Sequence, residues 1–392
     1  MLLTTFVIGT DDFVIAGLLT EIANDLRVSQ AAAGQLVTVF SVTYAVAAPV
    51  LAVLTAKLPR KGLVVGGLVV FAVANVATAV APSYGLLMAM RVVTALVAAS
   101  ITPAVFALAG RLSAPERIGR SIGTVAAGLT VSLFVGVPVG TLIGDAFGWR
   151  ATFVAVAVFS VLVSVASASF LPHLSGAPET TVRQKLRILG RPAIVMCVAG
   201  TVLGASSGLM TYTYIAPITE NLTGQKGAVL ALFIAVVGVA GAVGTFAGGR
   251  LVDRWGADKA LLATFVGLVV ATAALAAIGA VADQKAPVWL VAVALAVWGF
   301  NAWGFNPPMN TRALHLAQDA GTEAVALNTS GLYIGIAIAG GAGGAALSSY
   351  SGTGVSLTAT AIGVAALLLM IASTRRYPTA TPVSAPEAAN AA

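Results

Sequence analysis

Charged residues are scarce in this chain, and their scarcity excludes a soluble domain. Only 9% of the 392 residues are Asp, Glu, Lys or Arg, whereas 58% are hydrophobic. A soluble domain carries about 25% charged residues, because its surface must face water. The mean hydropathy of +0.97 points the same way. The composition therefore predicts a polytopic membrane protein.

Side chains that serve catalysis or metal binding are also rare. The single cysteine, Cys197, lies in an apolar run, so we expect neither a disulfide framework nor a thiolate metal cluster. His173 and His315 are far apart in sequence and are interpreted as interfacial residues rather than metal ligands. The sequence has no paired-histidine metal motif and no GxxxxGK[ST] phosphate loop. We therefore predict that the protein is not an enzyme, holds no metal site and does not use ATP directly.

What the chain does contain is a series of apolar runs of about 20 residues between short polar breaks, as in transmembrane helices. We place twelve such segments, at 2–22, 32–56, 62–81, 84–110, 119–143, 148–171, 192–217, 226–249, 259–281, 287–312, 323–347 and 353–373. The longest internal break separates two sets of six. The predicted fold class is all-α, with two six-helix bundles at 1–172 and 192–374, a cytoplasmic linker at 173–191 and a disordered cytoplasmic tail at 375–392.

Lys and Arg are concentrated in alternate breaks between these segments. Sixteen of the 21 basic residues lie in the even-numbered breaks and the tail, four lie in the odd-numbered breaks, and Arg91 lies inside a segment. Basic loops stay on the cytoplasmic side of a membrane. This pattern predicts that both termini are cytoplasmic. It also explains the net charge of +7 by topology, so no nucleic-acid partner is expected.

Two adjacent acids, Asp11 and Asp12, lie near the middle of the first apolar segment. An acid at the centre of a membrane helix costs about 2.5–3.5 kcal/mol on insertion scales, so a chain that carries one is expected to use it. Adjacent helical residues point about 100° apart, so the pair cannot face one cavity squarely. We predict that one of them binds and releases a coupling proton, and the sequence leaves open which. The alternative is that the helix starts late and both acids lie at the membrane interface.

Arg91 is the one basic residue well inside an apolar segment. A guanidinium stays charged at any physiological pH, so it needs an acid or backbone carbonyls as partner. Asp11 or Asp12 is the predicted partner, and a pair that breaks when the acid is protonated would act as a switch. The alternative is a structural pair that never titrates.

The fifth segment carries glycines at spacings of four and eight residues. They are Gly128, Gly136, Gly140 and Gly144, with Pro138 between two of them. Small residues on one face let membrane helices approach closely, and a proline bends the helix that contains it. We therefore predict a tightly packed helix seam here.

The second half offers amides and aromatic side chains as candidate ligands. Such groups suit a neutral or amphiphilic molecule that stacks and forms hydrogen bonds. For any one of them, a role in the core or at the membrane interface is the alternative. The candidate substrate-cavity residues are Tyr212, Tyr214, Trp298, Asn301, Asn306, Asn328 and Tyr333.

These residues make the chain resemble the major facilitator superfamily, in particular its drug:proton antiporter branch. The bacterial group of arabinose-efflux-like, purine-nucleoside-efflux and chloramphenicol-resistance permeases is the most similar in pattern. Residues 9–29 resemble the opening of that group, with Asp12 in place of the usual Glu, and Arg91 fits its helix-four arginine motif. Residues 136–153 resemble the antiporter motif of helix five, and the second half agrees at 212–217, 248–256 and 326–344.

The resemblance implies an alternating-access exporter of a small organic molecule, such as a drug, an antibiotic or a metabolite, driven by protons. The protein would be a monomer in the plasma (inner) membrane of a bacterium, with the substrate, protons and the lipid bilayer as its partners. The helix-one acid and Arg91 would handle the proton, the helix-five motif would hold the interface between the bundles, and no cofactor would be needed. A sugar or nucleoside facilitator or symporter is an alternative, as is a membrane sensor of the same fold that transports nothing.

One motif departs from the family pattern. In the gating loop after the second segment, Arg60 and Lys61 resemble the family pattern, but Ala56 stands where the family usually carries Asp. The corresponding loop of the second half keeps Asp253 and Arg254. The first-half charge contact is therefore expected to be missing or replaced.

Overall fold

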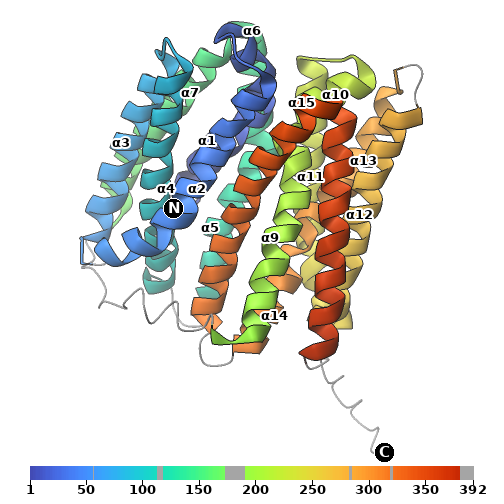
Figure 1. The fold of residues 1–392 in the computed structure, drawn as a ribbon. Coiled ribbons are helices and arrows are strands. Elements are labelled where there is room, and N and C mark those ends of the chain that lie inside the picture. Colours follow the sequence, from blue (N-terminus) through green and yellow to red (C-terminus); the bar gives the residue numbers. More distant parts are fainter. Residues whose placement is uncertain (56, 113–117, 173–189, 282–284, 318–320, 380–392) are drawn as a thin grey trace, which may run out of the picture.

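The computed structural model of the protein describes the chain except for residue 56 and residues 113–117, 173–189, 282–284, 318–320 and 380–392 (Figure 1). Every regular element in the described part is a helix. Ala56, His173 and most of the predicted linker and tail lie outside the described residues.

Two groups of helices, which we call the N-half and the C-half, lie on either side of the linker. The N-half comprises α1 (Leu2–Asp25), α2 (Gln30–Leu54), α3 (Arg60–Ala79), α4 (Tyr84–Leu112), α5 (Ile118–Val131), the π-helical turn η2 (Ser132–Gly136), α6 (Val137–Phe147) and α7 (Trp149–Phe170). The C-half comprises α9 (Pro192–Thr213), α10 (Ile215–Thr223), α11 (Ala228–Trp255), α12 (Ala257–Val281), α13 (Val288–Gly304), α14 (Asn306–Ala317) and α15 (Gly321–Arg376).

Eleven helical stretches of the described chain are long and apolar enough to cross a membrane. The last, Leu327–Arg376, spans 50 residues and has non-helical backbone angles at Tyr350 and Ser351, where φ is −141° and 60°. The chain turns back there, and Figure 1 shows the second arm of α15 descending to the C-terminus. The described chain thus makes twelve crossings, and the predicted twelve-helix, all-α fold class is confirmed.

Three of the crossings are interrupted, and a proline lies close to each interruption. A proline has no N–H to donate to the preceding turn, so a helix tends to bend or restart near it. η2 ends two residues before Pro138, α10 begins two residues before Pro217, and α14 carries Pro307 and Pro308 directly after Asn306. The bend predicted in the fifth segment is therefore a π-helical turn, a feature that often occurs at functional sites.

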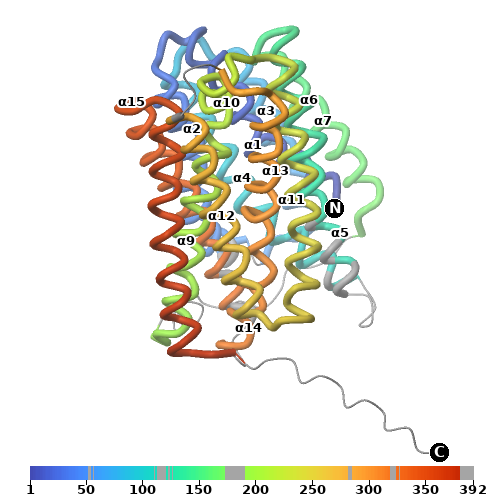
Figure 2. The backbone as a smooth tube through the Cα atoms, turned by 90° about the vertical axis from the view of Figure 1, so that its right-hand side faces the viewer, coloured from blue at the N-terminus to red at the C-terminus, as the bar shows by residue number. Residues whose placement is uncertain are grey.

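The helices run between two ends of the molecule. We call the end where α2, α4, α7 and the second arm of α15 finish the linker end, and the other the far end. Figures 1 and 2 show the helices of both halves running between these ends, with the C-terminus leaving at the linker end.

The two halves meet along two seams. In one, α2 packs against the first arm of α15, where Gly340 lies directly against Thr38. In the other, η2 and α6 pack against α11, where Gly238 faces the backbone of Phe134. Both seams depend on a glycine, because a side chain there would collide with the opposite helix. The acid-bearing α1 lies between these seams and contacts both halves.

Candidate functional site

Asp11 and Arg91 form an ion pair inside the N-half. The Arg91 Nη1 atom donates to Asp11 Oδ2 at 2.8 Å and to the Asp11 carbonyl oxygen at 3.1 Å. Both side chains are only 1% exposed, and the guanidinium carbon lies 4.4 Å from the centre of the Phe40 ring. The charge of the arginine is therefore balanced by a carboxylate from α1 and by the face of an aromatic ring from α2.

Asp12 points away from that pair and lies at the contact between the halves. Its Oδ2 atom accepts a hydrogen bond of 3.4 Å from the Tyr333 hydroxyl, which comes from α15. The Tyr333 ring stacks on Tyr44 of α2 with ring centroids 3.9 Å apart. A distance of 3.4 Å is long for an O–H···O bond, so this contact is weak. Asp12 is 3% exposed, and this weak hydrogen bond joins it to the C-half.

An aromatic cluster surrounds Asp12 on its C-half side. Tyr212 packs edge-on against Phe13 of α1, with ring centroids 5.6 Å apart, and also against Trp298 and Trp303. Among the described residues, the Tyr212 hydroxyl and Trp298 Nε1 are buried without a hydrogen-bond partner. Buried donors without a partner are rare in folded proteins and point to a missing water or ligand.

The space beside this cluster is almost closed. A cavity of about 10 Å³ lies between the halves and is lined by Asp12, Phe13 and Tyr212 among others. That volume holds about one water molecule. A substrate therefore fits here only after the halves have moved apart.

The helix-five glycines pack on α1. Gly136 lies against Thr10, Gly140 against Val14 and Thr152, and Gly144 against Leu18. The side chains they meet are also four residues apart, so the two helices interlock turn by turn next to the acids. In this seam the glycines contact the N-half itself, whereas η2 and α6 contact α11 with other residues, among them Phe134, two residues before Gly136. Pro138 is buried at the start of α6.

The four gating-loop residues lie at the linker end. Arg60 is 8% exposed and starts α3, followed by the half-buried Lys61, whereas Asp253 and Arg254 are exposed near the end of α11. Ala56, the departure from the family pattern, falls outside the described residues.

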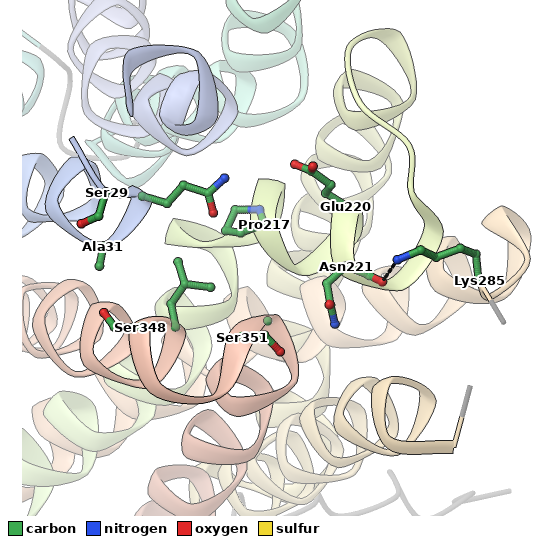
Figure 3. Close-up of a pocket in the computed structure, with 11 residues that line it drawn as sticks. Ser29, Ala31, Pro217, Glu220, Asn221, Lys285, Ser348 and Ser351 are labelled. Carbon is green, nitrogen blue, oxygen red and sulfur yellow. Dashed lines mark hydrogen bonds between the residues drawn. The ribbon is translucent and has the colours of Figure 1, made fainter. Parts of the chain in front are cut away.

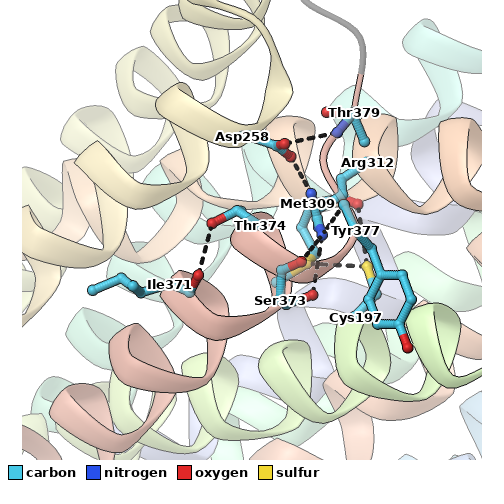
Figure 4. A network of polar contacts seen from close by, with 9 residues as sticks. All are labelled: Cys197, Asp258, Met309, Arg312, Ile371, Ser373, Thr374, Tyr377 and Thr379. Carbon is cyan, nitrogen blue, oxygen red and sulfur yellow. Dashed lines mark hydrogen bonds and ion pairs between the residues drawn. The ribbon is translucent and has the colours of Figure 1, made fainter.

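Arg312, which sequence reasoning counted only as a loop charge, is fully buried at the same end of the C-half. It pairs with Asp258 of α12 and donates to the carbonyl oxygen and the hydroxyl of Ser373, each at 3.0 Å, and to the Tyr377 carbonyl at 2.8 Å (Figure 4). Asp258 also accepts a hydrogen bond from the Thr379 N–H. This network ties the last residues of the described chain to α12 and α14. The sequence signal that could have revealed it is an acid on the first turn of α12, opposite a lone arginine.

The remaining predicted cavity residues lie away from Asp12. Tyr214 lies toward the far end, where its hydroxyl donates to the Gly340 carbonyl at 2.5 Å. Asn301 donates to Val297 within α13, and Asn328 donates to Asn310 at 2.8 Å in a network of the C-half. Asn306 is the first residue of α14. The structure thus brings Tyr212, Trp298 and Tyr333 together with the acids, and not these four.

A second, larger hollow opens at the far end between the halves. It has a volume of about 690 Å³ and is lined by polar groups including Ser29, Glu220, Asn221 and Lys285 (Figure 3). Lys285 Nζ donates to the Asn221 carbonyl at 2.9 Å, as the dashed line in Figure 3 marks. The contacts of Tyr214 and Gln35 with Gly340 also join helices near this end.

Comparisons with known proteins fit this architecture. Residues 1–322 match the family model of the Major Facilitator Superfamily. The inner membrane transport protein YdhP of Escherichia coli (strain K12) is 30% identical over 378 residues, which are 95% of this chain and 94% of that protein. A chloramphenicol resistance protein of Streptomyces lividans is 31% identical over 335 residues, which are 84% of this chain and 83% of that protein.

Among solved structures, a bacterial homolog of the human lysosomal transporter Spinster, in an inward-facing and occupied conformation, is similar with a TM-score of 0.72. Its sequence identity is 17%, and the match covers 97% of this chain and 98% of that one. At this identity the likeness concerns the fold alone.

Proposed function

The chain belongs to the major facilitator superfamily of membrane transporters, and on this basis we propose that it exports a small organic molecule in exchange for protons. Its family makes it a multi-pass membrane transporter, and members of this family are not enzymes. Proton coupling, the direction of transport and the class of substrate are our proposals, as are the residues that serve them.

The observation that carries the proposal is the different surroundings of the two adjacent acids. Asp11 is held by Arg91 within one half, so its charge is balanced whatever the other half does. Asp12 faces the other half, and the partner that it has there is a tyrosine hydroxyl at 3.4 Å. We assign the coupling proton to Asp12, because loading or releasing it changes a contact between the halves. Asp11 and Arg91 then provide a fixed charge pair that holds α1 against α4.

Alternating access in this proposal is a relative movement of the two halves, 1–172 and 192–374, about the site at Asp12. The bundle-to-bundle geometry of such transporters places the substrate between two repeats near the membrane midplane. The cavity of about 10 Å³ beside Asp12 and Tyr212 is where we expect that space to open. The linker end is cytoplasmic in this proposal, in line with its excess of Lys and Arg.

We propose an uncharged or amphiphilic substrate with an aromatic or planar part. The Tyr212 and Trp298 rings offer stacking surfaces, and their buried donors have no partner among the described residues. A ligand acceptor would satisfy one or both of them. The chloramphenicol resistance relative makes a phenicol antibiotic the first molecule to assay.

Transport into inverted membrane vesicles tests the proposal. We expect Asp12→Asn to abolish export driven by the pH gradient at normal expression, because the amide keeps the shape of the side chain but cannot carry a proton. Asp25→Asn is a matched control, since it makes the same change on the same helix at an exposed ion pair with Arg150. If the Asp12→Asn protein still responds to the pH gradient like the control, the proton site lies elsewhere and the assignment fails.

A further inference from the structure

A hollow on the side of the N-half is not used by the proposed function. It has a volume of about 360 Å³ and lies between α1, α7 and the η2–α6 segment. We call it the lateral groove. Its floor includes Thr10, Gly136 and Gly140, and its rim includes Val139 and Phe159.

Two glycines form part of the floor of the groove, and they let α1 pack directly on η2 and α6 there. Gly136 of η2 and Gly140 of α6 are buried, while Val135 and Val139 stand out beside them with 41% and 48% of their surface exposed. The edge-on contact of Phe6 with Phe159, with ring centroids 5.7 Å apart, borders the groove.

The groove offers nothing to a polar ligand. Its two hydroxyl groups are already used within the chain, since Thr10 donates to the Phe6 carbonyl at 2.8 Å and Thr152 donates to the Gly140 carbonyl at 2.7 Å. The other side chains that line it are hydrocarbon. Water in such a hollow would lack the polar partners that it needs.

The position of the groove decides what fills it. All of its lining residues belong to three membrane-crossing stretches, Leu2–Asp25, Ala127–Phe147 and Trp149–Phe170. On α7 the surface beside it continues into Val154 and Val158, which are 48% and 55% exposed. Exposed apolar side chains on membrane-crossing helices face lipid, so the groove is an indentation in the lipid-facing surface.

We propose that an acyl chain of a membrane lipid occupies the lateral groove as a resident ligand. The acyl chain lies along α1 against Thr10, which directly precedes Asp11 and Asp12. The atoms that line an empty groove lack van der Waals contacts on one side, and each methylene group of the acyl chain in the groove supplies them. The lipid thereby supports the acid-bearing helix without touching the acids, neither of which lines the groove.

Native mass spectrometry of protein extracted in a mild detergent tests this, with phosphatidylethanolamine of defined chain length as the probe. We expect wild-type protein to retain one lipid after washing. Ala155→Trp, which fills the groove from its rim, should abolish this retention, because the indole takes the space of the acyl chain. Val73→Trp on α3 is the control, since Val73 is also an apolar membrane-facing residue and is 63% exposed.

A second measurement locates the lipid. A phosphatidylethanolamine with a diazirine at the end of its acyl chain should label peptides from α6 and α7 more strongly than the exposed face of α3, and Ala155→Trp should remove that excess. Equal labelling of both faces, or retention unchanged by Ala155→Trp, would overturn the proposal. Replacement of the lipid by an added phenicol would also overturn it, because the groove would then serve the transported molecule. None of these outcomes depends on whether Asp12 carries the proton.

Discussion

Breaking the Asp11–Arg91 pair should destabilise the protein strongly, whereas replacing both members should not. In the variant Arg91→Met, the Asp11 carboxylate stays buried at 1% exposure without its guanidinium partner. Removing one member of a buried ion pair costs about 3–5 kcal/mol, because it leaves the other charge buried and uncompensated.

The opposite single variant, Asp11→Leu, should lower the free energy of unfolding by an amount near the lower end of that range. The arginine keeps the Asp11 backbone carbonyl at 3.1 Å and the Phe40 ring at 4.4 Å. A cation over a ring in a desolvated site is worth about 2 kcal/mol and stays in place, so we expect a loss of about 3 kcal/mol in the free energy of unfolding. The double variant Asp11→Leu/Arg91→Met buries two apolar side chains and should lose about 1 kcal/mol or less.

Denaturant titration of purified protein in mixed micelles, followed by tryptophan fluorescence, measures all four states of this cycle. The expected coupling energy between the two positions is about 5 kcal/mol or more, since the losses of the two single variants far exceed that of the double variant. Asp12→Asn serves as the neighbouring control and should change the free energy of unfolding by less than about 1 kcal/mol, because its 3.4 Å bond is weak. Losses that simply add would refute the reasoning, since the pair would then not act as a compensated unit.

Two further predictions concern helix packing and the linker end. Gly140→Leu should impair folding or halt transport, because even a Cβ there would lie 2.6 Å from a Val14 methyl group. Gly249→Leu on α11 is the control, since position 249 has open space around it. Expression and transport rates of the two variants check this, and wild-type turnover with Leu at position 140 would contradict a tight seam. Arg312→Met should lower the free energy of unfolding by about 3–5 kcal/mol and expose residues 373–379 to proteolysis. Arg254→Met, at an exposed position, should do neither. Equal protease resistance of the two variants would show that the Arg312 network does not hold the chain end.

Much of the fold follows from the sequence because each membrane crossing is a local property. A run of about 20 apolar residues must form a helix in lipid, whatever its neighbours do. The interruptions near Pro138 and Pro217 are also local, since each proline removes a backbone donor.

The pairing of Arg91 was predictable only in part. A charge in the membrane interior needs a partner, and the two acids of α1 were the available ones, but the choice between Asp11 and Asp12 depends on how α1 is rotated in the bundle. That rotation is set by the packing of Thr10 and Val14 on the helix-five glycines, which is a tertiary contact.

Contacts between distant segments left no signal in a single sequence. Tyr333 meets Asp12 across 321 residues, and nothing in the local pattern of α15 distinguishes this tyrosine from Tyr214, which packs elsewhere. The buried Arg312 network was missed for a related reason, because a basic residue beside a polar break looks the same whether its side chain turns inward or outward. The lateral groove needs three helices to be in place before it exists.

The close fit of Gly136, Gly140 and Gly144 against α1 limits how the acid-bearing helix can move. A rotation of α1 about its own axis would drive Thr10 or Val14 into the backbone of its neighbour, so α1 must travel together with η2 and α6 as one rod. That rod packs on α11 through η2 and α6, where Gly238 faces the backbone of Phe134. A displacement of the acid-bearing helix therefore reaches the opposite bundle through close backbone packing as well as through the contact of Asp12 with Tyr333.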